Sequence, residues 1–349
     1  MRLYIHIPFC EQKCNYCAFT SYVSKEKKIA LYFEKLLFAI EFFLNKKEVK
    51  ELKSIYIGGG TPSLVDSKFY EPIFQKLSFF MQDKSEITIE ANPSSLTKEW
   101  LLHMKSLGVN RLSLGIQSFD DKKLAFLGRV HNSNEAILAL ENIFEVGFKN
   151  LSVDLIYGTF LDNLNLLESD LKKAITFPIT HLSAYTLTIE KNTPFFKKEN
   201  IIKKSDDYSK FIKEFLEDRG FNHYEVASFG KVKSKHNLAY WNYEEYIGVG
   251  CSAVGFDGKV RYTNTHNLNS YLKNPLNLKY EKIDKEKRYF EKIFLGLRSE
   301  VGICKSELLE NDLKNAITLL DEGMLRLKDE RFYAKDFFIA DSLALYIMN

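Results

Sequence analysis

The sequence predicts an α/β fold built on a parallel β-sheet, followed by a small, mostly helical, winged-helix-like domain. In the first half, β-rich runs alternate with helical patterns at intervals of about thirty residues, the length of a βαβ unit. This rhythm stops near Ile189, and a third composition begins near Lys285. The 349 residues, 45% of them hydrophobic, are enough for one large domain with smaller attachments.

Six runs are expected to form strands, each followed by a helical pattern or a loop. Strand, helix and strand repeated in this way predict right-handed βαβ units and a parallel sheet. Six units are fewer than the eight of a closed barrel, and the pattern alone fits both a doubly wound sheet and an open partial barrel. The expected strands are "RLYIHIP", "SIYIGG", "EITIEAN", "RLSLGIQ", "LSVDLIY" and "HLSAYTL", and the expected helices span 29–45, 69–81, 97–106, 134–146, 164–175 and 208–218.

Three segments with different patterns define the expected domains. Residues 1–188 carry the strand–helix rhythm, and residues 189–284 form an extension in which it breaks. Residues 285–349 read as two or three helices with a terminal hairpin, the winged-helix-like unit.

Composition and charge exclude several classes of protein. A net charge of +3 is too small to indicate a nucleic-acid partner. No secretory signal is visible, and the most apolar segment, "LYFEKLLFAIEFFLNKK", is charged and shorter than the ~20 residues of a membrane span. Five cysteines, three of them crowded, do not fit a secreted disulfide framework. A cytoplasmic location is expected, with peripheral membrane contact and homodimerisation left open.

Cys10, Cys14 and Cys17 lie within eight positions, directly after the first expected strand. They are too close for ordinary structural disulfides, but as thiolates in a loop they can converge on one point. Zinc is a competitor, although it usually has four ligands and the neighbouring His6 sits inside the strand. Iron–sulfur clusters are also held by cysteine thiolates. The spacing therefore favours a 4Fe–4S cluster on three cysteines, with one iron left open; zinc or chance placement are the alternatives.

Polar residues and glycines gather where the expected strands end. In parallel α/β folds ligands bind at the carboxyl ends of the strands. These groups together suit a ligand with ribose hydroxyls, an amino group and a carboxylate. Each alone could instead cap a helix, fill a turn or form a surface ion pair. They are Gly58, Gly59, Gly60 and Thr61 of "GGGTP", then Glu90, Gln117, Arg129 and Asp154.

CxxxCxxC after the first strand and "GGGTP" after the second resemble the radical S-adenosylmethionine (SAM) superfamily. The resemblance implies a partial (β/α)6 barrel in which SAM binds the open iron. An electron from the cluster then splits the sulfonium to give a 5′-deoxyadenosyl radical. From Tyr4 to the C-terminal unit, the chain is similar to the coproporphyrinogen dehydrogenase (HemN/HemW) branch of that superfamily.

This branch implies a role for each site residue. Tyr4 and Tyr16 would flank the cluster and touch SAM, and the segment 58–61 would bind its amino end. Polar contacts would come from Glu90, Gln117, Arg129 and Asp154, with a guanidinium suited to the carboxylate. One departure is "DLIYGTF", where the family usually has Leu-Pro after the glycine; this should alter the loop and not Asp154.

Two functions are compatible with this branch: an oxygen-independent coproporphyrinogen III dehydrogenase, and a chaperone that binds haem and delivers it to apo-cytochromes or other haem-accepting proteins. The dehydrogenases resemble CxxxCxxCxC, but Phe19 stands at the position of the added cysteine. They also carry a longer N-terminal extension, whereas Cys10 lies nine residues after Met1. "HNLAYW" matches the HNxxYW pattern of the haem-chaperone group. All three features favour the chaperone.

Within this family, His236, Tyr240 and Trp241 are expected to contact haem. Imidazole is a usual axial ligand of haem iron, and the two aromatic rings could stack on a porphyrin. From the hexapeptide alone, a helix-capping histidine beside two core aromatics is the favoured interpretation, and only the family resemblance reverses this. The sequence thus predicts a cytoplasmic haem chaperone with a 4Fe–4S cluster and SAM. It assigns no catalytic residue and does not decide whether SAM is cleaved. The alternatives are the dehydrogenase and a scaffold that only carries the cluster.

Overall fold

The computed structural model describes residues 1–203 and 206–349. Its main element is a nine-stranded sheet in the order β7-β8-β6-β5-β4-β3-β2-β1-β9. A doubly wound sheet reverses its strand order at a switch point. Here the first six strands are parallel neighbours in chain order, and the sheet stays open, so the fold is a partial barrel. These strands are β1 (Arg2–Ile7), β2 (Leu52–Gly59), β3 (Met81–Ala91), β4 (Arg111–Gln117), β5 (Leu151–Tyr157) and β6 (His181–Thr186).

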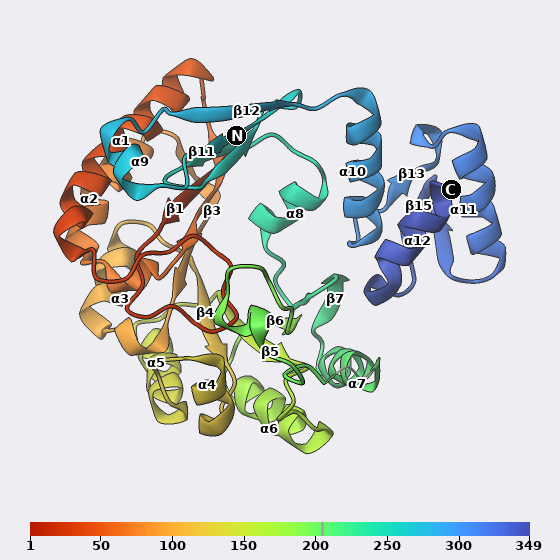
Figure 1. Ribbon diagram of the computed structural model, residues 1–349, viewed down its shortest axis with the longest axis horizontal. Coiled ribbons are helices and arrows are strands. Elements are labelled where there is room, and N and C mark those ends of the chain that lie inside the picture. Colours follow the sequence, from red (N-terminus) through yellow and green to blue (C-terminus); the bar gives the residue numbers. More distant parts are fainter. Residues whose placement is uncertain (204–205) are drawn as a thin grey trace.

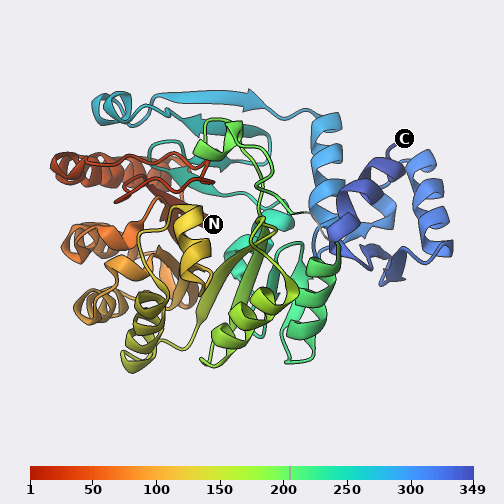
Figure 2. The ribbon, with the colours of Figure 1, turned by 60° about the horizontal axis from the view of Figure 1, so that its bottom comes forward.

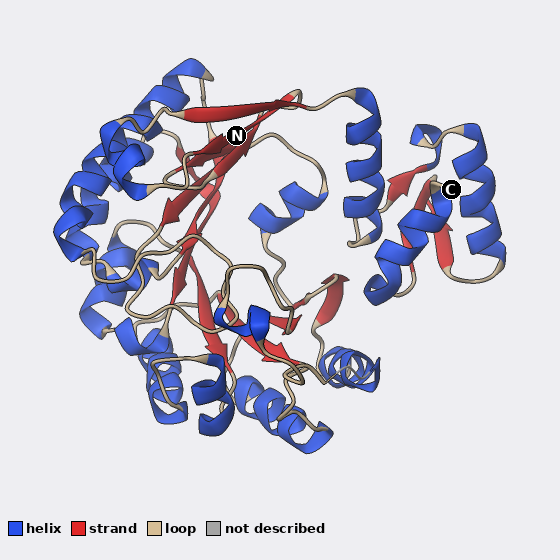
Figure 3. Ribbon diagram, viewed as in Figure 1, coloured by secondary structure: helices blue, strands red, loops and turns tan. Residues whose placement is uncertain are grey.

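One layer of helices covers the convex face of this sheet (Figures 1 and 3). The expected helix 69–81 is wrong at its end, because α2 stops at Leu77 and Met81 already pairs with Leu52 as the start of β3. A further helix, α4, was not expected. The Asp120 side chain caps it and Gly128 ends it in a left-handed conformation, but seven residues are too few for a clear period. The helices are α1 (Ile29–Lys46), α2 (Glu71–Leu77), α3 (Lys98–Ser106), α4 (Asp121–Leu127), α5 (Ser133–Glu145) and α6 (Leu164–Ile175).

The two faces of the sheet differ in chemistry because side chains alternate along each strand. The row of neighbours Ile5, Ile57, Ile89 and Leu112 is apolar and fully buried in the core beneath the helices. The adjacent row, on the concave face, is polar. It consists of Tyr4, Tyr56, Thr88 and Arg111.

The segment after β6 extends the sheet at both edges. Strand β8 joins β6 in antiparallel orientation, and β9 joins β1 in parallel. Helix α8 lies on the concave side of the sheet (Figure 1). The elements are α7 (Asp206–Glu217), β7 (Asn222–Glu225), β8 (Ser228–Gly230), α8 (Lys235–Trp241), β9 (Ile247–Val249), β10 (Val254–Phe256), β11 (Val260–Asn264), α9 (Leu268–Lys273) and β12 (Leu278–Lys282).

The C-terminal unit stands beside the barrel and has a core of its own (Figure 2). It combines three helices with a small antiparallel sheet in the order β13-β15-β14, as expected for a winged-helix-like unit. The expected terminal position of the hairpin is wrong, because the helix Ala340–Ile347 follows it. No helix in the described part of the chain is long and apolar enough to span a bilayer. Its elements are α10 (Lys285–Leu297), β13 (Ile303–Cys304), α11 (Glu310–Asp321), β14 (Leu325–Lys328), β15 (Arg331–Ala334) and α12 (Ala340–Ile347).

Candidate functional site

The three clustered cysteines lie in the loop that follows β1, at the carboxyl edge of the sheet. The backbone N–H of Asn15 donates to the carbonyl of Leu127 (3.0 Å), and that of Cys17 donates to Cys14 (3.3 Å), so the loop is fixed against α4. All three thiols are free and half-buried. Burial raises the pKa of the Cys10 and Cys17 thiols. Because metal binding needs thiolates, a bound cluster would have to displace these protons.

The loop is not arranged as a site for a single ion. Among residues 1–203 and 206–349, no three His, Cys, Asp or Glu side chains are placed to hold one metal ion. In a 4Fe–4S cluster, however, each cysteine binds a different iron atom, so the sulfurs stand apart instead of meeting at one point. The finding therefore does not test a cluster, and ligation by the three cysteines stays a prediction.

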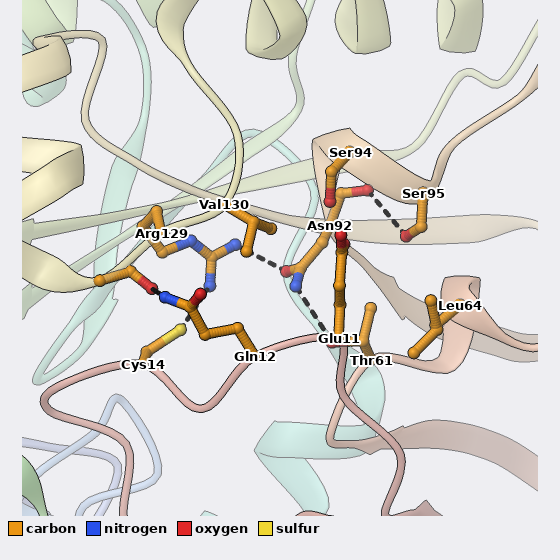
Figure 4. A pocket seen from close by; sticks show the side chains of 11 residues that line it. Glu11, Gln12, Cys14, Thr61, Leu64, Asn92, Ser94, Ser95, Arg129 and Val130 are labelled. Carbon is orange, nitrogen blue, oxygen red and sulfur yellow. Dashed lines mark hydrogen bonds between the residues drawn. The ribbon is translucent and has the colours of Figure 1, made fainter. Parts of the chain in front are cut away.

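A chain of hydrogen bonds connects the sulfurs of Cys10 and Cys14, and Figure 4 shows the part of it that runs through Thr61, Asn92 and Arg129. The Thr61 hydroxyl donates to Cys10 Sγ (3.6 Å), and Asn92 Nδ2 donates to Thr61 Oγ1 (3.0 Å). Arg129 donates from Nη2 to Asn92 Oδ1 (2.7 Å) and from Nη1 to Cys14 Sγ (3.4 Å). Donors at a sulfur favour its thiolate form and orient it as a metal ligand.

Asn92 is a candidate site residue that sequence reasoning missed. It stands two positions after Glu90 at the end of β3, so the strand-end rule could have found it. Its amide fixes Arg129, which also donates to the Gly115 carbonyl (2.7 Å). The guanidinium is therefore largely committed to the protein. Its Nε is buried without a partner, which leaves one donor for a ligand.

The three glycines after β2 fit tightly against their neighbours. A Cβ on Gly58 would lie 2.7 Å from Glu90 Cδ, and one on Gly60 would lie 2.7 Å from the Phe9 carbonyl oxygen. Gly59 has φ +116°, a conformation that favours glycine. Its N–H donates to Glu90 Oε2 (2.9 Å). These positions thus let the Glu90 carboxyl and the cysteine loop approach the strand end.

Two carboxyl groups on the concave face are held in surroundings that favour their neutral forms. Glu90 accepts from the Tyr56 hydroxyl (2.8 Å), and burial raises its pKa to about 7. Asp154 accepts from the Ser113 hydroxyl (3.1 Å), and burial raises its pKa as well. Because an opposite charge favours the ionised form, a cationic ligand would draw both groups towards ionisation.

Gln117 joins the same group of side chains at the end of β4. Its φ of +69° is unusual for a residue other than glycine, and such conformations cluster at binding sites. A Cβ on Gly115 would lie 2.9 Å from Gln117 Nε2, 3.3 Å from Asn92 Oδ1 and 3.5 Å from Arg129 Nη2. Asp154 is the register partner of Gly115 on β5. The structure therefore brings these strand-end residues together.

The two tyrosines expected beside the cluster have different surroundings. Tyr4 OH lies 2.9 Å from His6 Nδ1, and His6 Nε2 lies 2.9 Å from the Thr20 carbonyl. Since a carbonyl only accepts, Nε2 carries the proton and Nδ1 accepts from Tyr4. Tyr4 thus orients the cysteine loop through His6. Tyr16 is partly buried against a small apolar cluster that includes Phe195.

The residues expected to contact haem lie on α8, apart from the cysteine loop. His236 is 1% exposed, with Nδ1 2.8 Å from Ser54 Oγ and Nε2 2.9 Å from Tyr240 OH. Burial lowers its pKa to about 3. Because both ring nitrogens have partners, iron ligation requires one of these bonds to break and stays a prediction. Trp241 is half-buried and lines a cavity beside the C-terminal unit.

Comparisons with known proteins agree with this geometry. The model of the radical SAM superfamily matches residues 4–174. Two proteins named heme chaperone HemW are similar over most of their length. The one from Lactococcus lactis is 33% identical over 325 residues, covering 89% of this chain and 84% of the relative. The one from Buchnera aphidicola subsp. Schizaphis graminum is 38% identical over 312 residues, covering 84% and 82%.

A solved structure shares the fold across the whole chain. Coproporphyrinogen III oxidase (HemN) from Escherichia coli, described as a radical SAM enzyme, superimposes with a TM-score of 0.83. The alignment covers 99% of this chain and 89% of that one, at 20% sequence identity. At this identity, the similarity supports a shared fold only.

Proposed function

The chain belongs to the radical SAM superfamily and, within it, to the HemW family, and from this we propose that it is a haem chaperone that carries a 4Fe–4S cluster and binds SAM. The observation that carries the proposal is the similarity to heme chaperone HemW over 89% of the chain, a share that must include much of the sequence beyond the barrel. The haem would be delivered to apo-cytochromes or other haem-accepting proteins.

The cysteine loop is the proposed cluster site. Cys10, Cys14 and Cys17 would each hold one iron and leave the fourth open for SAM. A bound cluster supplies one-electron reduction of SAM. Thr61 and Arg129 support this assignment because they already donate hydrogen bonds towards two of the sulfurs. Such contacts tune a cluster and keep its ligands oriented.

The surrounding groups support SAM as the second ligand. SAM carries an ammonium, a carboxylate and ribose hydroxyls. Glu90 and Asp154 offer carboxyls that a cation would ionise, and the buried Arg129 Nε offers an unused donor. Gln117 would add a polar contact beside them. Further contacts are proposed from Tyr4, Tyr16, Gly58, Gly59, Gly60 and Thr61.

The alternative function is oxygen-independent coproporphyrinogen III dehydrogenase. The observation that favours this alternative is the similarity of the fold to HemN over the whole chain. Phe19 argues against it, because a phenyl ring two residues after Cys17 cannot relay a proton or an electron as a thiol does. Its side chain is 69% exposed and so does not serve the core either.

One comparison separates the two functions. The anaerobically reconstituted protein is titrated with haem while its Soret absorbance is followed, and a parallel sample receives coproporphyrinogen III, SAM and a low-potential reductant. We expect a saturable Soret shift and no protoporphyrinogen. Formation of protoporphyrinogen without haem binding would overturn the chaperone in favour of the dehydrogenase.

A further inference from the structure

Two cavities lie between the body of the protein and its C-terminal unit, away from the cysteine loop. They measure about 130 and about 230 Å³ and open on either side of Tyr243. One runs between the end of α8 and the C-terminal unit, and the other faces β10 and β11. We call them together the junction cleft. The wall residues used below are Trp241, Tyr243, Lys292 and Arg331 of the first cavity, and Tyr240, Tyr246 and Phe256 of the second.

Aromatic rings form a continuous wall in this cleft. The ring centroids of Tyr240 and Tyr246 are 4.5 Å apart, those of Tyr243 and Phe256 are 4.9 Å apart, and Tyr246 and Phe256 join the two pairs at 6.4 Å. Trp241 follows Tyr240 directly at the end of α8. Aromatic walls with a few polar groups are typical of sites for flat, largely apolar ligands.

A fixed positive charge stands in the first cavity. Arg331 donates from Nε to the Val301 carbonyl (2.9 Å) and from Nη2 to the Gly302 carbonyl (3.1 Å). In the part of the chain that the structure describes, it forms no ion pair and its Nη1 has no hydrogen-bond partner. Lys292, by contrast, is paired with Glu307 at 2.6 Å. A guanidinium held in one orientation with a free edge is suited to a carboxylate.

Tyr243 separates the two cavities and is itself strained. Its φ is +58°, a conformation that persists in a residue other than glycine only where its surroundings fix it. The hydroxyl donates to Glu291 Oε2 (2.6 Å), and Arg261 donates to both oxygens of the same carboxylate (2.9 and 2.7 Å). The contacts with Glu291 and Arg261 thus hold the Tyr243 ring at the centre of the cleft despite its strained backbone.

We propose that the junction cleft binds one edge of the haem macrocycle, with a propionate at Arg331 and the ring against Trp241 and its aromatic neighbours. This rests on the proposed chaperone function and names the groups that would perform it. The cavities are too small to enclose a porphyrin, so most of the ring stays exposed, which suits a protein that must release it. His236 is then a positioning residue that holds Tyr240 through Nε2, and iron ligation by histidine is not required.

The test compares haem with metal-free protoporphyrin IX on the full-length reconstituted protein, by Soret absorbance. We expect both to bind with similar affinity, because the cleft holds the ring and a carboxylate and not the iron. Arg331→Gln should weaken both by about tenfold, the usual cost of a lost charged hydrogen bond. Trp241→Ala should weaken both by about tenfold or more, as for a central aromatic contact. Arg326→Gln, in the same unit but outside the cleft, is the matched control and should change neither.

The outcomes separate the cleft from the function. If the unaltered protein binds no haem, the chaperone proposal fails and the cleft fails with it. If haem binds but protoporphyrin does not, and His236→Ala abolishes the binding, the iron is ligated by histidine and the cleft is wrong while the function stands. Unchanged affinity in Arg331→Gln also overturns the cleft. If Trp241→Ala fails to fold, the affinity of Arg331→Gln alone tests the cleft, because Arg331 is only half-buried.

Discussion

Two buried cations in this chain, Lys123 and Arg111, have opposite surroundings. Lys123, on α4, is fully buried and lies 2.7 Å from Asp162 Oδ1 and 3.5 Å from Asp170 Oδ2. Arg111, on the concave face of β4, is 1% exposed, yet its side chain has no hydrogen bond or ion pair within residues 1–203 and 206–349. Its Nε is buried without a partner, as is Oγ1 of its register neighbour Thr88.

The difference distinguishes a network that stabilises the fold from a face that is proposed to bind a ligand. Every member of the Lys123 network is matched: Ser118 and the Phe119 N–H donate to Asp170, and Thr159 donates twice to Asp162. A closed network of this kind fixes the loops after β4 and β5. The concave face instead has buried donors without a hydrogen-bond partner, and carboxyl groups whose raised pKa favours the neutral form. Because unpartnered buried polar groups are costly, Arg111 Nε and Thr88 Oγ1 support the proposal that a ligand completes the contacts on this face.

The largest effect on stability is expected from Lys123→Met. The substitution leaves two buried carboxylates without their cation, which typically costs about 3–5 kcal/mol of the free energy of unfolding. Urea denaturation monitored by circular dichroism measures the loss. The exposed Lys122→Met is the matched control and should change stability little. Equal stability of the two variants would show that the buried network does not hold the fold.

Glu90 is expected to give the next largest effect, through pH. The folded carboxyl keeps its proton to about pH 7, whereas an ordinary glutamate loses it near 4.5. The folded state therefore binds more protons between these values, so stability falls as pH rises from about 4.5 to about 7 and is level above. The contribution is about 3 kcal/mol for a shift of this size. Denaturation midpoints of the SAM-free protein across that range measure it.

Glu90→Gln serves as the control for that titration. The amide cannot ionise, so the fall between pH 4.5 and 7 should shrink in this variant. An identical pH profile in the two proteins would place the titrating group elsewhere. SAM should also bind more tightly as pH rises through about 7, because its ammonium favours the ionised carboxylate.

Asn92→Ala is expected to weaken the binding of the cluster at the cysteine loop. The change removes the link between Thr61 and Arg129 without touching a cysteine. Loss of such an orienting group commonly weakens metal binding by about 10- to 100-fold. The rate at which the reconstituted cluster bleaches in air measures this. Ser94→Ala, in the same pocket (Figure 4) but with no side-chain hydrogen bond in the described structure, should bleach at the rate of the unaltered protein.

The smallest effect on stability is expected from Arg111→Met. The substitution leaves no protein group newly unpartnered, and an apolar replacement of a buried charge is often neutral, so the change should stay within about 1 kcal/mol. Urea denaturation beside Lys123→Met measures it. A loss as large as that of Lys123→Met would break the comparison. The charge of Arg111 also lowers the pKa of Glu90, so in this variant the pH-dependent fall should still begin near pH 4.5 but extend to higher pH.

Local sequence patterns predicted much of the fold but less of the candidate site. The first six strands and most of their helices follow from alternation and helical spacing, but a short helix such as α4 leaves too little periodicity. Non-local pairing is not encoded in any one segment: Leu3 of β1 pairs with Ile247 of β9, and His236 contacts Ser54 across 182 positions. Because Ser54 lies so far from His236 in the sequence, "HNLAYW" alone did not reveal that the His236 imidazole is buried and hydrogen-bonded.

The most direct test of the account is chemical analysis and electron paramagnetic resonance of the anaerobically reconstituted protein. We expect about four iron atoms and about four sulfides per chain, with a spectrum of the reduced cluster that changes when SAM is added. Cys14→Ser should lose most of the iron, while Cys304→Ser, in the C-terminal unit, should keep it. A protein that carries zinc, lacks sulfide and does not respond to SAM would contradict the account.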